Sequence, residues 1–126
     1  MKNLNDDYRG TETILVVDDD EQVIDITANI LMSYGYKVIT AFDGQEGVEQ
    51  YKLNSDNIDL IIMDIVMPRK DGISAYKEII NINKNAIIIL SSGFNNINLA
   101  VFNDISVLQK PYKSINLLET IRNKLD

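Results

Sequence analysis

The sequence predicts an α/β domain, a doubly wound five-stranded parallel sheet with helices on both faces. Five short apolar runs alternate strictly with stretches whose apolar residues recur at helical spacing. Uninterrupted apolar runs are typical of strands buried on both faces, and their alternation with helices implies parallel strands joined by right-handed crossovers. The chain has 126 residues and no internal linker or repeat, so its size fits one domain.

The predicted strands share a short apolar composition, and they are Thr13–Asp18, Lys37–Ala41, Ile58–Asp64, Ala86–Ser91 and Ser106–Gln109. The stretches with helical periodicity are Glu21–Tyr34, Gln45–Leu53, Ile73–Ile82, a short segment around Ile97–Phe102, and Ser114–Leu125. Asp20 and Ser114 are the predicted N-caps of the first and last helices. Gly35 is expected to end the first helix, because glycine adopts the left-handed conformation that follows many helices.

The first twelve residues are polar and lack the apolar stretch of a signal peptide. We therefore expect a disordered leader at residues 1–12 and one folded domain at residues 13–126. The longest apolar runs, such as Ala86–Leu90, are strand-length and too short to cross a membrane, so no membrane association is expected.

The composition narrows the chemistry that the chain can support. It contains no cysteine and no histidine, which excludes disulfides, Ser-His triads and zinc sites built on Cys or His. Any metal must be held by oxygen, which points to a hard cation such as Mg²⁺ or Ca²⁺. The formal net charge of −7 argues against a nucleic-acid partner, because phosphate backbones are bound by clustered Lys and Arg.

Polar side chains follow four of the five predicted strands. They are the triplet Asp18-Asp19-Asp20, the single Asp64, the pair Ser91-Ser92, and Lys110. Parallel strands bring such groups to one edge of the sheet, where ligands of doubly wound folds bind. Each group alone also fits a solvated turn or a helix cap, but the joint arrangement favours a functional site.

This set of groups suits phosphoryl transfer to an aspartate. Clustered carboxylates repel one another, and Mg²⁺ relieves the repulsion because it binds one or two carboxylates, several waters and a substrate phosphate. Lys110 adds a positive charge that can pair with a phosphoryl oxygen, and a serine hydroxyl can donate to another. Positioning and charge neutralisation supply most of the catalysis in such reactions.

Four blocks of the sequence resemble the receiver domain of bacterial response regulators, in that family's order. They are ILVVDDDE (Ile14–Glu21), IIMDIVMPRKDG (Ile61–Gly72), ILSSGF (Ile89–Phe94) and LQKPY (Leu108–Tyr112). The resemblance runs from about Thr13 to Leu125 and is closest to chemotaxis regulators. It implies a flavodoxin-like (βα)5 fold with strand order 2-1-3-4-5. It also implies a cytoplasmic domain that is no enzyme beyond its own phosphorylation and dephosphorylation.

The resemblance assigns roles to the acidic residues. Asp64 in MDIVMP is expected to be the phosphoacceptor of a two-component phosphorelay. Mg²⁺ would be bound directly by Asp19, partly through water by Asp18, and by Asp64. The backbone carbonyl of Val66 would complete the protein ligands.

The resemblance also implies roles for a lysine and a serine. Lys110 would pair with the phosphoryl group and precede a cis peptide bond at Pro111. Ser92 is the expected switch hydroxyl; Ser91 is the alternative, because only one of two adjacent strand residues faces the site. Val107 stands where the family often has an aromatic residue that rotates inward on activation, so the aromatic half of the switch is expected to be absent or altered.

The implied phosphodonor is a histidine kinase or a histidine phosphotransfer protein. A downstream protein partner is expected on the face formed by the helix around Ile97–Phe102, the strand Ser106–Gln109 and the helix Ser114–Leu125. The domain is expected either to stand alone or to come from a hybrid histidine kinase, since Gly10–Thr13 resembles the lead-in of such receivers.

Two other interpretations remain open at this point. Haloacid-dehalogenase-like phosphatases also use an aspartate nucleophile, Mg²⁺, a hydroxyl and a lysine, and Asp18–Asp20 could be their first-strand D-x-D pattern. That interpretation leaves the MDIVMP block unexplained. A pseudo-receiver would keep the fold as a binding module without phosphorylation, although the complete set of acids and Lys110 argues against it.

Overall fold

The computed structural model describes residues 8–93 and 106–126. The strands are β1 (Thr13–Val17), β2 (Lys37–Ala41), β3 (Leu60–Asp64), β4 (Ile88–Ser92) and β5 (Val107–Gln109). The helices in these ranges are α2 (Glu21–Ser33), α3 (Gly44–Asn54), α4 (Gly72–Ile82) and α5 (Ser114–Leu125). None of these helices has both the length and the apolar character that a membrane span requires. The predicted helix around Ile97–Phe102 lies outside the described residues.

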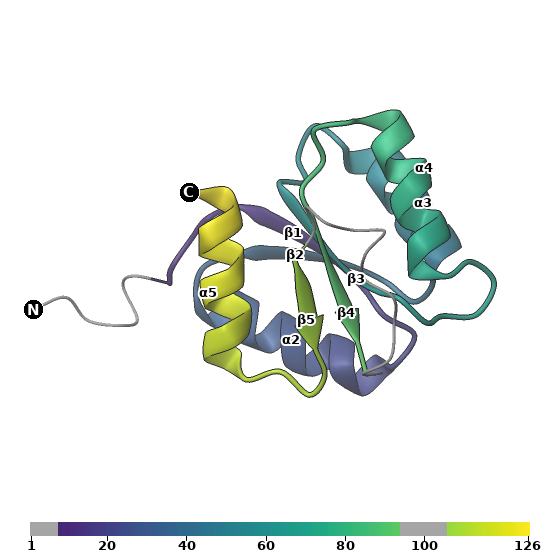
Figure 1. The fold of residues 1–126 in the computed structure, drawn as a ribbon. Helices are drawn as coiled ribbons and strands as arrows, with labels where there is room; N and C mark the ends of the chain where they lie inside the picture. Colours follow the sequence, from purple (N-terminus) through teal and green to yellow (C-terminus); the bar gives the residue numbers. More distant parts are fainter. Residues whose placement is uncertain (1–7, 94–105) are drawn as a thin grey trace, which may run out of the picture.

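The sheet confirms the predicted topology. All neighbouring strands are parallel, in the order β2-β1-β3-β4-β5 (Figure 1). Helices α3 and α4 cover one face, and α2 and α5 cover the other. Successive residues of β3 alternate between the two apolar clusters: Ile61 and Met63 pack with α3 and α4, whereas Leu60 and Ile62 pack with α2 and α5.

The ends of α2 and α5 can be compared with the predicted helix caps. The Asp20 side chain accepts a hydrogen bond from the Gln22 N–H at 2.9 Å, and Gly35 has a φ of 98°, so both signals are confirmed. The predicted cap at Ser114 is wrong. Ser114 is already the first residue of α5, so the cap position belongs to Lys113. Lys113 is extended and makes no side-chain cap hydrogen bond.

Several predicted strand boundaries are also shifted. β1 ends at Val17 rather than Asp18, β4 begins at Ile88 rather than Ala86, and β5 begins at Val107 rather than Ser106. β3 begins at Leu60 rather than Ile58, because the Ile58 N–H donates to the Asn54 carbonyl at 3.0 Å and so closes the turn that follows α3. β4 extends to Ser92, whose carbonyl accepts the Lys110 N–H at 2.7 Å. Both serines after the fourth apolar run therefore lie inside the sheet.

Residues 8–12, expected to be part of a disordered leader, are held against the domain. The Gly10 N–H donates to the Tyr34 carbonyl and the Lys37 N–H donates to the Glu12 carbonyl, each at 3.0 Å. The Glu12 carboxylate receives a forked ion pair from Arg122 of α5, with Nη1–Oε1 and Nη2–Oε2 distances of 2.9 and 3.1 Å. Residues 8–12 therefore make backbone and side-chain contacts with the folded domain, although no apolar periodicity marks this segment.

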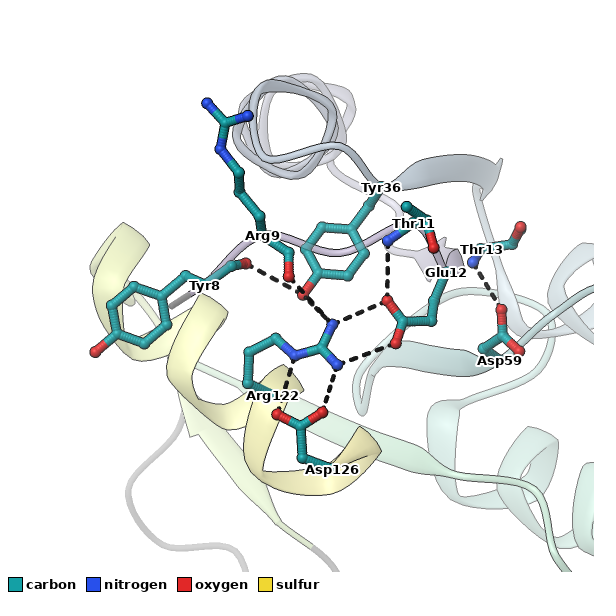
Figure 2. A network of polar contacts seen from close by, with 9 residues as sticks. All are labelled: Tyr8, Arg9, Thr11, Glu12, Thr13, Tyr36, Asp59, Arg122 and Asp126. Carbon is teal, nitrogen blue, oxygen red and sulfur yellow. Dashed lines mark hydrogen bonds and ion pairs between the residues drawn. The ribbon is translucent and has the colours of Figure 1, made fainter. Parts of the chain in front are cut away.

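Arg122 is the centre of a polar network that joins the N-terminal segment to α5 (Figure 2). Besides Glu12, its guanidinium donates to the Tyr36 hydroxyl at 3.1 Å and to the Asp126 carboxylate at 2.5 Å. The hydrogen bond from Arg122 holds the pKa of Glu12 below its ordinary value. The contribution of this pair to stability is therefore present above the ordinary pKa of Glu and is lost as the pH falls through the lowered one.

Replacing Arg122 with methionine is expected to lower the free energy of unfolding by about 1–2 kcal/mol, because Glu12 and Tyr36 lose a shared charged donor while the apolar stem is kept. Urea denaturation measures this change, and hydrogen exchange at Gly10 and Lys37 should become faster. Lys77→Met, on the exposed side of α4, is the control. Equal losses of stability in the two variants would mean that the network contributes nothing.

Candidate phosphoacceptor site

Three carboxylates converge at the carboxyl edge of the sheet. Asp18 follows β1 directly, and Asp64 is the last residue of the neighbouring strand β3. Each of Asp18, Asp19 and Asp64 offers a carboxylate oxygen that lies within 4.8 Å of the others. Asp18 and Asp64 are buried, whereas Asp19 is exposed. The convergence that the strand ends predicted is therefore present.

Side-chain alternation explains why two of these carboxylates face each other. Val16 of β1 and Ile62 of β3 pack in the apolar cluster beneath α2 and α5. Two residues further along each strand, Asp18 and Asp64 take the same face at the sheet edge. The third acid, Asp19, is exposed to solvent, and its carboxylate still lies within 4.8 Å of the other two.

The outer two of the three consecutive aspartates make different hydrogen bonds. Asp18 accepts the Asp20 N–H at 2.9 Å, and its own N–H donates to the Ala41 carbonyl of β2 at 3.1 Å. Asp20 caps α2, so its carboxylate is used by the helix rather than by the site. Asp18 and Asp19 remain as the acidic pair next to Asp64.

Lys110 brings the balancing charge from the end of β5. Its Nζ lies 2.5 Å from Asp18 Oδ2 and 3.4 Å from Asp64 Oδ2. The Lys110–Pro111 peptide bond is cis, as predicted. The lysine side chain is 19% exposed, so the ion pairs are shielded from water on most sides.

The surroundings of Asp64 disfavour ionisation of its carboxyl group. Burial, together with the charge of Asp18, raises the pKa of Asp64 to about 6, although Lys110 acts in the opposite direction. Burial lowers the pKa of Lys110, but the hydrogen bond to Asp18 and the charge of Asp64 outweigh burial, so the net pKa is raised. Lys110 is therefore a fixed cation, and it does not fully compensate the carboxylates around it.

The loop after Asp64 returns tightly to the sheet edge. The Ile65 N–H donates to the Ser91 carbonyl at 3.0 Å, and the Gly72 N–H donates to the Ile65 carbonyl at 2.7 Å. A Cβ at Gly72 would lie 2.1 Å from the Asp64 carbonyl oxygen, so only glycine lets α4 start this close to the end of β3. Val66, whose carbonyl is a predicted ligand, lies in this loop with its side chain half exposed.

The strand register distinguishes the two serines of β4. Asp64 is directly opposite Ser91, and partners in a parallel register present their side chains on the same face. Ser92 follows Leu90 on the opposite face, toward α3 and α4. The preference for Ser92 is therefore not supported by the register, which favours Ser91; both side chains are buried.

One ionic pair near the site was not predicted. Arg69, in the loop after β3, pairs with Asp43, which caps α3 from the neighbouring turn. The sequence Asp43-Gly44 indicated only a turn. No periodic pattern links a loop arginine to an acid on another loop, so only the folded arrangement reveals the contact.

Residues 14–122 match the response regulator receiver domain. The chain belongs to this family, whose members are receiver domains rather than classical enzymes, and its acidic pocket is that of Asp18, Asp19 and Asp64. This assignment, with the central acid on β3 rather than on the first strand, overturns the haloacid-dehalogenase-like interpretation.

Chemotaxis proteins are among the relatives. The chain is 48% identical over 80 residues to the chemotaxis protein CheY of Treponema pallidum, covering 63% of this chain and 56% of that protein. It is 35% identical over 118 residues to CheY of Bacillus subtilis, covering 90% and 97%. A crystal structure of a CheX-CheY-BeF3-Mg²⁺ complex from Borrelia burgdorferi is similar, with a TM-score of 0.83 and 31% identity, covering 89% of this chain and 87% of that one. The chain spans about half the length of the first curated relatives it matches.

Asp64→Asn is expected to stabilise the metal-free domain at alkaline pH, because it removes a carboxylate that is costly to ionise. A pKa raised from 3.8 to about 6 corresponds to a gain on the order of 1–3 kcal/mol above pH 7. The gain should shrink as the pH falls below the raised pKa, since the wild-type carboxyl then becomes neutral.

Urea denaturation in EDTA at pH 5 and pH 8 measures this difference. Asp56→Asn, at an exposed turn, is the matched control and should change little at either pH. A destabilised Asp64→Asn variant at pH 8 would contradict the unfavourable balance inferred for the site.

Proposed function

We propose that this domain is the phosphorylation switch of a two-component pathway, in which Asp64 accepts a phosphoryl group next to a bound Mg²⁺. The observation that carries the proposal is the meeting of three carboxylates with the single amine of Lys110 at one sheet edge. The similarity to a CheY solved with BeF3 and Mg²⁺ supports the same chemistry here, since BeF3 has the charge and shape of a phosphoryl group.

The donor set suits Mg²⁺. Carboxylate and carbonyl oxygens are the ligands that this hard cation prefers, and the chain has no histidine or cysteine to favour a softer metal. We propose that Asp19 binds the ion directly, Asp18 partly through water, and Asp64 together with the Val66 carbonyl completes the set. When bound, the ion supplies positive charge beside the phosphoryl oxygens.

The protein side of the reaction is a displacement at phosphorus. An oxygen of ionised Asp64 forms the new P–O bond, while the P–N bond to the donor imidazole breaks and the imidazole takes a proton. The amine of Lys110, which already lies 3.4 Å from Asp64, is positioned to pair with a transferred phosphoryl oxygen.

A serine hydroxyl of β4 is proposed to bind the phosphoryl group in the switched state. Ser92 was expected from the sequence, but the register favours Ser91 because it is the direct strand partner of Asp64. Movement of this hydroxyl toward the phosphoryl group would increase the population of an active conformation.

The proposed phosphodonor is a histidine kinase or histidine phosphotransfer protein. Next to Lys110 lies a cavity of about 510 Å³ between α2 and the segment after β5, lined by Val23, Ile26, Thr27, Gly93, Lys110, Pro111 and Tyr112. Its mainly apolar rim, including the exposed Ile26, suits a protein that delivers a phosphoryl group to the adjacent edge.

The remaining assignments are proposals of the same kind. A downstream partner is proposed to bind the face of β5 and α5 together with the segment 94–105, which lies outside the described residues. We place the domain in the cytoplasm, where it either stands alone or belongs to a hybrid histidine kinase. Residues 13–126 are proposed as the receiver domain, with residues 8–12 attached through Arg122.

Incubation with Mg²⁺ and acetyl phosphate is expected to add one phosphoryl group per chain, on Asp64. Mass spectrometry after borohydride trapping maps the modified residue. Asp64→Asn and Asp64→Ala should abolish labelling, whereas the control Asp56→Asn should label normally. Labelling that persists in the Asp64 variants would assign the acceptor elsewhere, and an unlabelled wild-type protein would favour a pseudo-receiver.

Ser91→Ala is expected to slow labelling by roughly tenfold, because one hydrogen bond to the phosphoryl group is worth about 1 kcal/mol or more. Ser92→Ala should stay within about twofold of wild type, since this side chain belongs to the opposite face of β4. Labelling rates, with circular dichroism to verify folding, compare the two variants. The reverse ranking would restore Ser92 as the switch hydroxyl.

A further inference from the structure

The loop between β3 and α4 contains a residue in the left-handed conformation. Arg69 has a φ of 65°, a value that an L side chain holds only when its surroundings favour it. The next residue continues the tight turn, because the Lys70 N–H donates to the Pro68 carbonyl at 2.7 Å. The chain that follows Asp64 is therefore bent sharply within a few residues of the site.

An ion pair with Asp43 holds Arg69 in this position. Its Nε and Nη2 lie 2.7 and 2.5 Å from Asp43 Oδ2, while Asp43 Oδ1 accepts the Glu46 N–H at 2.8 Å. Burial opposes ionisation of Asp43, but the Glu46 N–H and the Arg69 charge outweigh burial and keep the pKa below its ordinary value. The Asp43 side chain is 11% exposed, so it forms a fixed anchor for a largely exposed arginine.

A second contact joins the same two loops. The Gly44 N–H donates to the Lys70 carbonyl at 3.1 Å, and a Cβ at Gly44 would lie 2.1 Å from that oxygen. The turn before α3 thus contacts both the side chain of Arg69 and the backbone of its neighbour.

Backbone hydrogen bonds fix the two ends of the loop next to the sheet, and side-chain contacts hold its middle. Hydrogen bonds of Ile65 to Ser91 and of Gly72 to Ile65 hold the first and last residues. Between them, the Met67 side chain is buried in the apolar cluster beneath α3 and α4, and Lys70 pairs with Glu78 of α4. Arg69 is the residue of this stretch whose side chain pairs with the turn before α3, at Asp43. The Val66 carbonyl lies on this stretch.

We propose that Arg69 is a positioning residue, and that its ion pair with Asp43 fixes the backbone after Asp64 in the geometry that Mg²⁺ binding requires. The inference rests on the function proposed above. Without the pair, Arg69 can relax toward negative φ, and the loop carbonyls then lose their fixed direction. Mg²⁺ demands near-ideal octahedral geometry, so a small displacement of one ligand weakens its binding.

If the Arg69–Asp43 pair served only to stabilise the fold, its loss would lower global stability rather than Mg²⁺ affinity. Arg69 is 65% exposed, and a pair with one exposed partner contributes little to global stability. We therefore expect variants of this pair to change Mg²⁺ affinity strongly while the urea midpoint in EDTA changes little. Labelling of Asp64 should be slow at low Mg²⁺ and should return toward the wild-type rate at saturating Mg²⁺.

The test compares Arg69→Ala, Asp43→Asn and the double variant, with Mg²⁺ binding measured by calorimetry. Asp43→Asn retains an oxygen that can cap α3 but loses the charge that pairs with Arg69. Each single variant should weaken Mg²⁺ binding by roughly five- to tenfold, and the double variant should be no weaker than the singles, because both changes remove one interaction. Arg69→Lys should recover part of the affinity, and Lys77→Ala is the neutral control.

The results of these measurements distinguish a wrong positioning role for Arg69 from a wrong function for the domain. If wild type binds Mg²⁺ and labels on Asp64, but both single variants bind Mg²⁺ equally well, the positioning role is wrong and the proposed function stands. Additive losses in the double variant would also overturn the role of the pair. If wild type itself does not bind millimolar Mg²⁺, both proposals fail.

Discussion

Uncompensated negative charge in a partly buried site is the constraint on which the other features of this domain depend. Asp18 and Asp64 are held inside the carboxyl edge of the sheet, with Asp19 beside them and Lys110 as the opposing cation. Ionising Asp64 under these conditions is costly, which is why its pKa is raised to about 6. A site of this kind gains stability from any divalent cation that enters it, so metal binding and phosphorylation are coupled through charge.

The scaffold holds these charges together through ordinary packing. Alternation along β1 and β3 directs the two buried acids to the face beneath α2 and α5, and the apolar residues before them fix the register. On the other side, Gly72 allows α4 to begin directly against the end of β3. The Arg69–Asp43 pair then attaches the intervening loop to a second element. The geometry of the acidic site thus depends on residues that are far apart in the sequence.

Much of this arrangement is predictable from the sequence, for identifiable reasons. Apolar runs that are followed by Asp64 or Lys110 predict a parallel sheet. They also predict the position of the site, because the carboxyl ends of parallel strands lie at one edge. Which of the two adjacent serines faces Asp64 was harder to predict, because the answer depends on the register between β3 and β4. The attachment of residues 8–12 by Arg122 was missed, because a contact between the two ends of a chain leaves no local pattern.

The most direct measurement is a ¹³C NMR titration of the Asp64 carboxyl group in the metal-free protein and again with Mg²⁺. We expect it to titrate near pH 6 without metal and to shift to clearly lower pH when Mg²⁺ is added, because the cation favours the carboxylate. An ordinary aspartate pKa in the metal-free protein, unchanged by Mg²⁺, would contradict the crowding of charge at this sheet edge.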